Sequence, residues 1–463
     1  MTAAITRRSF APALPGTAEY AEAAAVFNEA SPARPAAAVT ARGVDDVRAA
    51  VVHAARAGLP VRVHSTGHSA GAAGAMEGSL LVRTRLGGEV RVDAERRVAH
   101  VPAGRTWSEV LAAATPHGLT APHGTSGTVG VVGYLLRGGV SFYSRRVGLA
   151  ANSVLAIELV TADGEVRRVD AAHDPELFWA LRGGGGGFGV VTAVEVALFP
   201  AARVVTGAAL WSGRDAERLL DRWRTWAVTA PREAATSFRV MNLPRIPEIP
   251  AELSAGPVVV VAGAVLAPEA SDLPLAERAA DDLLGPLRDV ARPLEDTWHV
   301  GGPADVPHAH MDPPGPVNVL GDHLLLRELG ADGAAAFLAA ADPGSASPLV
   351  AAELRQLGGA AAEPAAAGGA LDHLDAAYAY MGAGLPDLFP AERIRERLTA
   401  MRSALGPWDT GRTAPTFVES TDGPQGHLDA DALARVARIR ERVDPGGLFR
   451  EDVMAHTVAG RTR

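Results

Sequence analysis

The part of the chain before Pro200 alternates between two hydrophobic periods. Residues 44–58 carry apolar side chains at helical spacing, with acidic residues in the first turn and Gly58 at the end, which predicts an amphipathic helix. Shorter apolar stretches bounded by turn residues predict strands. They are Pro60–His64, Leu80–Arg83, Glu89–Val92, Val98–Val101, Val154–Thr161, Glu165–Val169 and Val190–Phe199. Strands and helices in such short alternation are typical of an α+β fold.

Turn and capping residues set the limits of several elements. Thr106–Glu109 has the pattern of a capping box and predicts a helix start. Asp163-Gly164, between two predicted strands, is the strongest hairpin signal in the chain. Asp174-Pro175 supplies the cap and the first residue of a further helix.

The pattern changes in the second half, where helices alternate with longer apolar strands. Ala216–Trp226 predicts a helix and Val258–Val265 a strand. An Ala/Gly/Pro tract at 358–370 predicts a flexible connection. Apolar residues from Leu433 to Val443 predict a last helix that stops at Asp444–Gly447. At about 150 residues per domain, the 463 residues suggest two or three domains.

Composition removes several kinds of chemistry. The chain has no Cys, which excludes thiolate catalysis, Cys-ligated metals and disulfides. It has no Lys either, since all 44 basic residues are Arg, which excludes a Lys Schiff base and the Lys of a phosphate-binding P-loop. The formal net charge of −9 argues against non-specific nucleic-acid binding, and no nucleic-acid partner is expected.

Two features bear on location. No run of 18 apolar residues occurs, so no membrane span is predicted. Residues 6–10 resemble the core of a twin-arginine export signal, but Glu19, Glu22 and Glu29 interrupt the apolar region that should follow. A cytoplasmic location is therefore expected.

Two glycine-rich segments are candidates for phosphate binding. Gly183–Gly189 has the letters of a dinucleotide fingerprint, but it follows a helix and precedes a strand, the reverse of the required order. In Gly124–Gly139 the glycines let backbone N–H groups approach a ligand and form an anion-binding nest. A tight connection that binds nothing is the alternative for this segment taken alone.

A third segment, His64–Ser69, places His68 in a turn directly after a predicted strand. A His in a turn is usually a surface residue, but the order of the segments around this one gives it weight. The turn "GHS" is followed by "TVGVVGYLLRGG", "LVTADGEV", "DPELFWALRGGGGGFGVVTAVEVALFP" and "RVDPGGLFRED". In this order the segments resemble FAD-binding proteins of the vanillyl-alcohol-oxidase type, and among them the bacterial berberine-bridge-enzyme-like oxidases.

The resemblance implies a two-lobed PCMH-type FAD-binding domain at 30–202 and a substrate domain with an antiparallel sheet backed by helices at 203–405. A segment at 406–463 would return to the FAD domain. It also implies one FAD, bonded covalently through His68 to the 8α-methyl carbon of the flavin. The implied cofactor-binding residues are Ser65, Thr66, Gly67, His68 and Ser69, then Gly124, Ser126, Thr128, Val129, Gly130, Gly133 and Tyr134, and finally Gly189 and Val191.

The chain departs from the family at positions that matter for catalysis. Many relatives make a second flavin bond from a cysteine where this chain has Ser126, so only the bond through His68 is expected. Many also carry Tyr-x-Asn-Phe near the end of the substrate domain, and its Tyr is the catalytic base. The matching segment here is Ala414–Phe417, so that base is missing.

Substitutes for the base are expected on two strand-like stretches. Tyr378 and Tyr380 share one face of Ala376–Gly384, and Tyr380 is the first candidate because a phenol can relay a proton. Glu353 is the second, because burial beside a flavin would raise its pKa towards the range of a working base. Arg355 on the same face could instead pair with Glu353 and hold it ionised and unreactive, which places Glu353 below Tyr380.

His308, His310 and Asp312 could form a metal-binding group. Their Pro-rich surroundings provide no rigid helix or strand to hold three ligands, and no metal is predicted.

The predicted function is that of an FAD-linked oxidase acting on a secondary-metabolite alcohol or amine. Hydride would pass from a C–H bond of this small molecule to the flavin, and oxygen would then be reduced to hydrogen peroxide. A flavin-bearing binding protein that has lost its base and a dehydrogenase with another electron acceptor are the alternatives. The oligomeric state is left open.

Overall fold

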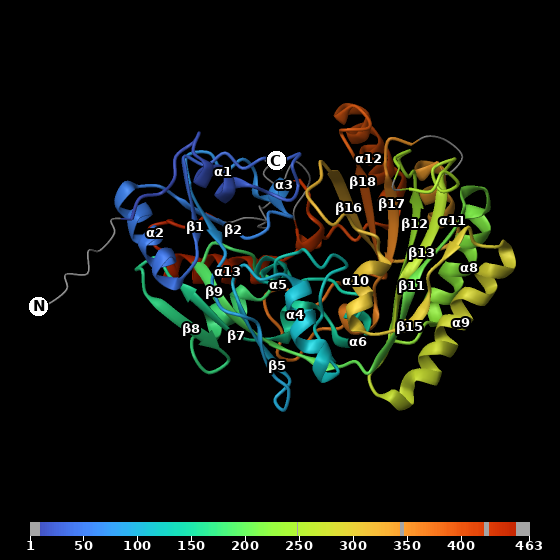
Figure 1. Cartoon of the computed structure of the whole chain (residues 1–463), viewed down its shortest axis with the longest axis horizontal. Helices are drawn as coiled ribbons and strands as arrows, with labels where there is room; N and C mark the ends of the chain where they lie inside the picture. Colours follow the sequence, from blue (N-terminus) through green and yellow to red (C-terminus); the bar gives the residue numbers. More distant parts are fainter. Residues whose placement is uncertain (1–9, 248, 343–346, 421–425, 451–463) are drawn as a thin grey trace, which may run out of the picture.

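The computed structural model describes residues 10–247, 249–342, 347–420 and 426–450. Two halves lie side by side (Figure 1). The first is built from the N-terminal part of the chain and the last helix, and the second from the middle of the chain. The mixture of helices and strands confirms the expected α+β class.

A small parallel sheet forms one lobe of the first half. Its order is β1 (Ala37–Ala41), β3 (Leu80–Thr84) and β2 (Val61–His64). The apolar stripe expected at 44–58 is the buried face of α2 (Val44–Ala57), which covers this sheet. Because β2 ends at His64, the turn that follows begins at the carboxyl edge of parallel strands, where ligands of α/β sheets commonly bind.

A five-stranded antiparallel sheet forms the second lobe. Its order is β4 (Arg91–Asp93), β5 (Val98–Pro102), β9 (Val190–Ala197), β7 (Val154–Val160) and β8 (Val166–Asp170). The hairpin between β7 and β8 turns at Asp163-Gly164 as expected, with Gly164 at φ 78°. The helices beside it are α4 (Trp107–Ala114), α5 (Val131–Leu136) and α7 (Pro175–Leu181). A further short helix, α6 (Ser144–Val147), contacts the second half of the molecule.

The second half contains a large antiparallel sheet with the order β14-β11-β13-β12-β17-β18-β16, and β15 pairs with β11. The strands are β11 (Arg203–Ser212), β12 (Ala234–Met241), β13 (Val258–Ala267), β14 (Glu295–Asp296), β15 (His299–Gly301), β16 (Leu320–Leu326), β17 (Ala351–Gln356) and β18 (Tyr378–Gly384). Helices cover one face of it, and the other face is turned to the first half (Figure 1). They are α8 (Ala216–Thr229), α9 (Leu273–Val290), α11 (Ala331–Ala341) and α12 (Ala391–Leu405).

The register of this sheet decides which side chains face the first half. Leu354 of β17 lies opposite Tyr380 of β18, so Tyr380 and Glu353 are on opposite faces. Tyr378 and Tyr380 are buried in the core under the helices, and the ring of Tyr380 is 6.5 Å from that of Phe337 in α11. The expectation that these two tyrosines act beside the flavin is therefore wrong, because both side chains point away from the first half.

Short elements complete the described chain. They are α1 (Ala18–Ala24), α3 (Ala70–Ala73), α10 (Val306–Ala309), β6 (Leu119–Thr120), β10 (Phe199–Pro200) and α13 (Ala430–Val443). The tract at 358–370, expected to be flexible, is tied to the first half because Arg182 donates to the carbonyl groups of Ala367 and Gly368. Of the helices described, none combines the length and the apolar character needed to cross a bilayer.

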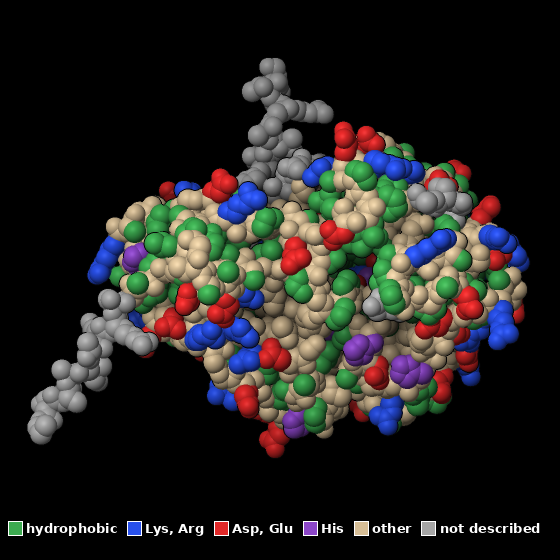
Figure 2. Space-filling model, turned by 45° about the horizontal axis from the view of Figure 1, so that its top comes forward, with side chains coloured by type: hydrophobic (Ala, Val, Ile, Leu, Met, Phe, Trp, Pro, Cys, Tyr) green, Lys and Arg blue, Asp and Glu red, His purple; other side chains and the backbone are tan. Residues whose placement is uncertain are grey.

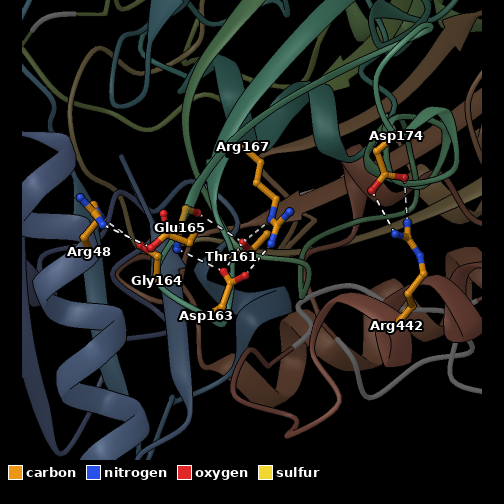
Figure 3. A network of polar contacts seen from close by, with 8 residues as sticks. All are labelled: Arg48, Thr161, Asp163, Gly164, Glu165, Arg167, Asp174 and Arg442. Atoms are coloured by element: carbon orange, nitrogen blue, oxygen red, sulfur yellow. Dashed lines mark hydrogen bonds and ion pairs between the residues drawn. The ribbon is translucent and has the colours of Figure 1, made fainter.

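The last helix lies in the first half. Arg442 of α13 donates hydrogen bonds of 3.1 and 2.8 Å to the two carboxylate oxygens of Asp174, the N-cap of α7 (Figure 3). Val436 of α13 is buried in the core of the second lobe, and Phe449 forms a bridge with β2. Of the segment 406–463 expected to return to the FAD domain, residues 451–463 lie outside the described residues.

Candidate functional site

A cavity of ≈ 540 Å³ lies between the two halves, within the size range of small-molecule sites. One wall is formed by the turn after β2 and by the glycine-rich segment that leads into α5. The other wall is the helix-free face of the large sheet, chiefly β12, β17 and β18. Predicted cofactor residues on the first wall are Ser65, Thr66, Gly67, His68, Ser69, Gly124, Ser126, Val129, Gly130, Gly133 and Tyr134.

Glycines allow the two segments of this wall to approach each other. Gly67 has φ +75°, and a Cβ on it would lie 2.6 Å from the backbone of Val26. The backbone N–H of Gly130 donates to Thr66 Oγ1 at 3.3 Å, and a Cβ on Gly130 would clash with Ser65 Oγ. A Cβ on Gly133 would instead point into open space, so this glycine leaves a hollow at the wall.

His68 is held in one orientation on this wall. Its ring stacks on Phe27 with 3.7 Å between centroids, and its Nε2 lies 3.0 Å from Thr128 Oγ1. Burial lowers the pKa of His68 to about 4, although Asp312 and Thr128 oppose the shift. The imidazole is therefore neutral at neutral pH, and its Nδ1 has no hydrogen-bond partner within the described residues.

These residues fit a flavin dinucleotide. The backbone N–H groups of Gly67 and His68 make no hydrogen bond to any described residue, so the turn has donors for an anionic group such as a pyrophosphate. Backbone donors are the appropriate kind in a chain without Lys. The hollow at Gly133 leaves room for a ligand beside these donors. The neutral imidazole of His68 provides a nucleophile there.

Three predicted cofactor residues are placed differently. Thr128 touches the site through its hydrogen bond to His68. Gly189 and Val191 do not line the cavity. Gly189 has φ +154° and packs against the carbonyl of Val160, and Val191 is buried in the core of the second lobe, so both act in packing.

The facing wall carries a buried charged cluster. Glu353 and Arg355, which are each 4% exposed, form an ion pair of 2.8 Å between Glu353 Oε1 and Arg355 Nε. His310 Nε2 lies 2.9 Å from Glu353 Oε2, and its Nδ1 lies 2.6 Å from Asp312 Oδ1. Asp312 also accepts a 2.9 Å hydrogen bond from Thr125 of the first wall. The cluster thus links both walls of the cavity.

The cluster reverses the pKa shift expected for Glu353. Burial by itself raises the pKa of this carboxyl, but Arg355, His310 and Arg239 outweigh burial and hold the pKa well below its usual range. Burial is likewise outweighed at Asp312, where His310 and Thr125 lower the pKa to about 2. Both carboxylates are therefore ionised at neutral pH, and for Glu353 the alternative of pairing with Arg355 is the one observed.

Two residues of the cavity wall were not singled out from the sequence. Arg239 is the single charged residue of β12, whose residues are all buried and mostly apolar. A charged residue in such a run could have been identified from the sequence as a candidate site residue. Its Nη1 donates to the carbonyl of His310 at 2.7 Å. Glu419 accepts a 3.3 Å hydrogen bond from Asn28, and burial raises its pKa to about 7. No motif or periodic pattern surrounds Glu419 in the sequence, so sequence reasoning did not identify it.

The residues considered for a metal do not come together. His308 is exposed, whereas His310 and Asp312 bond each other in the cluster. Within the ranges that the structure describes, no group of three or more His, Asp or Glu residues is arranged to hold a metal ion.

A second hollow, of ≈ 760 Å³, lies between α2, the turn of the β7–β8 hairpin and the loop after α13. Four of its charged side chains are paired with one another (Figure 3). Arg442 pairs with Asp174, and Arg167 pairs with Asp163 and Thr161. Because these donors and acceptors satisfy each other, this hollow is a seam between elements of the first half, and the smaller cavity is the candidate site.

Comparison with known proteins agrees with this geometry. Residues 35–170, which include the turn after β2 and the glycine-rich segment, match the FAD binding domain family. Among curated proteins, (R)-6-hydroxynicotine oxidase of Paenarthrobacter nicotinovorans is 36% identical over 168 residues, which are 36% of this chain and 37% of that protein. The matched segments span less than half the length of such curated relatives.

Solved structures match along nearly the whole chain. The crystal structure of 6-hydroxy-D-nicotine oxidase from Arthrobacter nicotinovorans has a TM-score of 0.80 at 24% identity and covers 96% of this chain and 97% of that one. Glucooligosaccharide oxidase from Acremonium strictum, described with a 6-S-cysteinyl, 8α-N1-histidyl FAD, has a TM-score of 0.76 at 20% identity, with 96% of each chain covered. At these identities the likeness shows the shared fold.

Proposed function

We propose that this chain, whose residues 35–170 form an FAD binding domain and whose fold is that of FAD-linked oxidoreductases, is an FAD-dependent oxidase. The substrate would be a small-molecule alcohol or amine of secondary metabolism. One observation carries the proposal: a single cavity has His68 on one wall and the ionised Glu353 cluster on the other. A cofactor attached at the first wall would meet a substrate held against the second.

His68 is the residue proposed to bond the flavin. A neutral imidazole with a free nitrogen is a nucleophile, and Nδ1 is the free nitrogen because Nε2 is engaged by Thr128. Ser126 has no thiol, so a single bond is proposed. The histidyl-linked FAD named for glucooligosaccharide oxidase gives this proposal a precedent within the fold.

The proposed chemistry is a two-electron oxidation. When bound, the FAD would supply a hydride acceptor for the substrate carbon and a route for the two electrons to oxygen, which would take up two protons to give hydrogen peroxide. The chain's own residues would handle the proton that leaves the substrate oxygen or nitrogen. His310 is the proposed acceptor, because its imidazole lines the cavity and Glu353 Oε2, 2.9 Å from its Nε2, would stabilise the protonated ring. Asp312 would fix the imidazole through Nδ1.

The covalent bond is tested by acid precipitation of the purified protein. The pellet of the wild type should stay yellow and fluoresce on a denaturing gel, and His68→Ala should release all its flavin into the supernatant. Soluble, folded His68→Ala that keeps flavin in the pellet, or wild type that releases all of it, would remove the assignment.

Anaerobic mixing with a substrate found by screening for peroxide release separates the remaining alternatives. An enzyme should bleach the band of oxidised flavin, whereas a binding protein should shift the band without bleaching it. Admission of oxygen should then restore the band and yield one peroxide per turnover. Reoxidation only by an artificial acceptor would indicate a dehydrogenase.

A further inference from the structure

Arg239 has donors that the protein leaves unused. Its Nη1 donates to the carbonyl of His310, but Nε and Nη2 are buried and have no hydrogen-bond partner within the described residues. The residue is 3% exposed and forms part of the cavity wall. Buried guanidinium donors without an acceptor are uncommon, because they lose water and gain nothing in exchange.

The unused edge is one with which three other arginines of this chain bind carboxylates. Arg402 donates from Nε and Nη2 to the carboxylate of Asp322, and Arg435 does the same to Glu176. Arg288 uses these two nitrogens on Asp296. This fork matches the two oxygens of a carboxylate.

The nearby carboxylates are not available to Arg239. Glu353 is engaged by Arg355 and His310, and Asp312 by His310 and Thr125. Both attract Arg239 only through space, and burial lowers the pKa of its guanidinium. The acceptor that completes this fork must therefore enter the cavity from outside.

On the side away from the Glu353 cluster, the wall beside Arg239 is apolar. Met241 and Leu243 follow it along the chain, and Ala351, Met381 and Leu385 line the cavity from the neighbouring strands and their ends. The outer surface, by contrast, has acidic and basic side chains interspersed over the face in Figure 2. Selective recognition of an anion is thus concentrated inside the cavity.

We infer that the substrate is a carboxylic acid with an apolar body, whose carboxylate is bound by Nε and Nη2 of Arg239. The inference rests on the proposed oxidase function and narrows it to hydroxy or amino acids with an apolar chain or ring. The carboxylate would lie on β12, and the carbon to be oxidised would lie towards Glu353 on the adjacent strand.

The probes are phenylacetate and phenylacetamide, which share a shape and differ in charge. Binding to the purified protein is followed by the rise in Tm, which needs no flavin signal, and by the change in the flavin spectrum. Phenylacetate should bind wild type at least tenfold more tightly than phenylacetamide. Arg239→Met should abolish this preference, Arg239→Lys should retain part of it, and exposed Arg218→Gln on α8 should leave it unchanged.

Equal affinity of wild type for the two probes, or no binding of either, would overturn the inference even if no Arg239 variant folds. A flavin spectrum altered in unliganded Arg239→Lys, together with unchanged phenylacetate affinity, would mean that Arg239 binds the cofactor and would also overturn it. If the purified protein contains no flavin but its Tm still rises more with phenylacetate than with phenylacetamide, the proposed oxidase function would be contradicted and the anion site would be supported.

Discussion

A hydroxyl group engages one nitrogen of His68 and leaves the other without a hydrogen-bond partner among the described residues. Thr128 Oγ1 lies 3.0 Å from His68 Nε2 and 2.9 Å from Ser126 Oγ. Since the imidazole is neutral, a proton on Nε2 donated to Thr128 leaves the lone pair on Nδ1. Phe27 fixes the plane of the ring by stacking. Thr128 would thus be a positioning residue for the proposed covalent bond.

Thr128→Val keeps the shape of this side chain and removes its hydroxyl. Loss of one hydrogen bond is worth about 1 kcal/mol, so the correctly oriented imidazole and the yield of covalent flavin should fall roughly fivefold. The ratio of flavin in the acid pellet to flavin in the supernatant measures this yield. Thr125→Val, whose hydroxyl bonds Asp312 instead, should keep the wild-type ratio. Equal ratios in the two variants would contradict the role of Thr128.

At the scale of the strand, neighbouring residues point to opposite faces of the sheet. Glu353 lies on the face opposite to Tyr380, because its neighbour Leu354 is the residue paired with Tyr380. Alternation within β17 and within β18 can be read from the sequence, and it correctly groups Glu353 with Arg355 and Tyr378 with Tyr380. Alternation does not reveal which of the two pairs faces the helices, because the face that a residue occupies depends on how the strands align in the sheet. The helix-covered face also holds the larger rings: Tyr380 packs against Phe337, and Tyr378 packs against Trp223.

Glu353→Gln and Tyr380→Phe form a matched test of the two faces. Glu353→Gln removes the negative charge that would stabilise a proton on His310; loss of general-base catalysis costs about a hundredfold, so anaerobic flavin reduction should slow by up to about that factor. Tyr380→Phe should change the rate less than twofold, and its Tm should not fall, because the buried Tyr380 hydroxyl has no partner within the described chain. A larger effect of Tyr380→Phe than of Glu353→Gln would refute this placement of the base.

Local sequence patterns predicted one wall of the site and not the other, because strand alignment cannot be read from local patterns. The turn at His68 and the glycine-rich segment are local patterns, and their residues line one wall together. The facing wall is assembled from β12, β17, β18 and residues 310–312, which meet only through long-range pairing. Local spacing therefore raised the possibility of a metal group at His308, His310 and Asp312, although no metal was predicted. In the fold, His310 instead contacts Glu353 and Asp312 instead accepts from Thr125.

At the scale of the whole molecule, one buried carboxyl joins distant parts of the chain. Asn28 donates to Glu419 and to the carbonyl of Val319, which connects the N-terminal segment, the strand start near β16 and the segment after residue 414. Burial raises the pKa of Glu419 to about 7, against the opposing effects of Asn28 and Arg137. The folded chain therefore prefers this carboxyl in its neutral form.

The sign of the resulting pH dependence follows from the raised pKa. Below pH 4.5, the ordinary pKa of Glu, Glu419 is protonated in both states and contributes nothing. Between pH 4.5 and about 7 the unfolded chain releases the proton and the folded chain keeps it, so stability falls as pH rises. The loss is complete above pH 7 and amounts to no more than about 3 kcal/mol.

Glu419→Gln should remove this loss. Its free energy of unfolding in urea, relative to wild type, should rise by up to about 3 kcal/mol between pH 4.5 and pH 7.5, because all other groups titrate alike in the two proteins. Glu217→Gln on the exposed face of α8 is the matched control and should show a constant difference from wild type. The glutamine can still accept the hydrogen bond from Asn28, so the effect isolates the charge and not the contact. A difference between Glu419→Gln and wild type that stays constant with pH would mean that Glu419 ionises in the folded chain as easily as in the unfolded one, and that the cavity end at Asn28 is open to water.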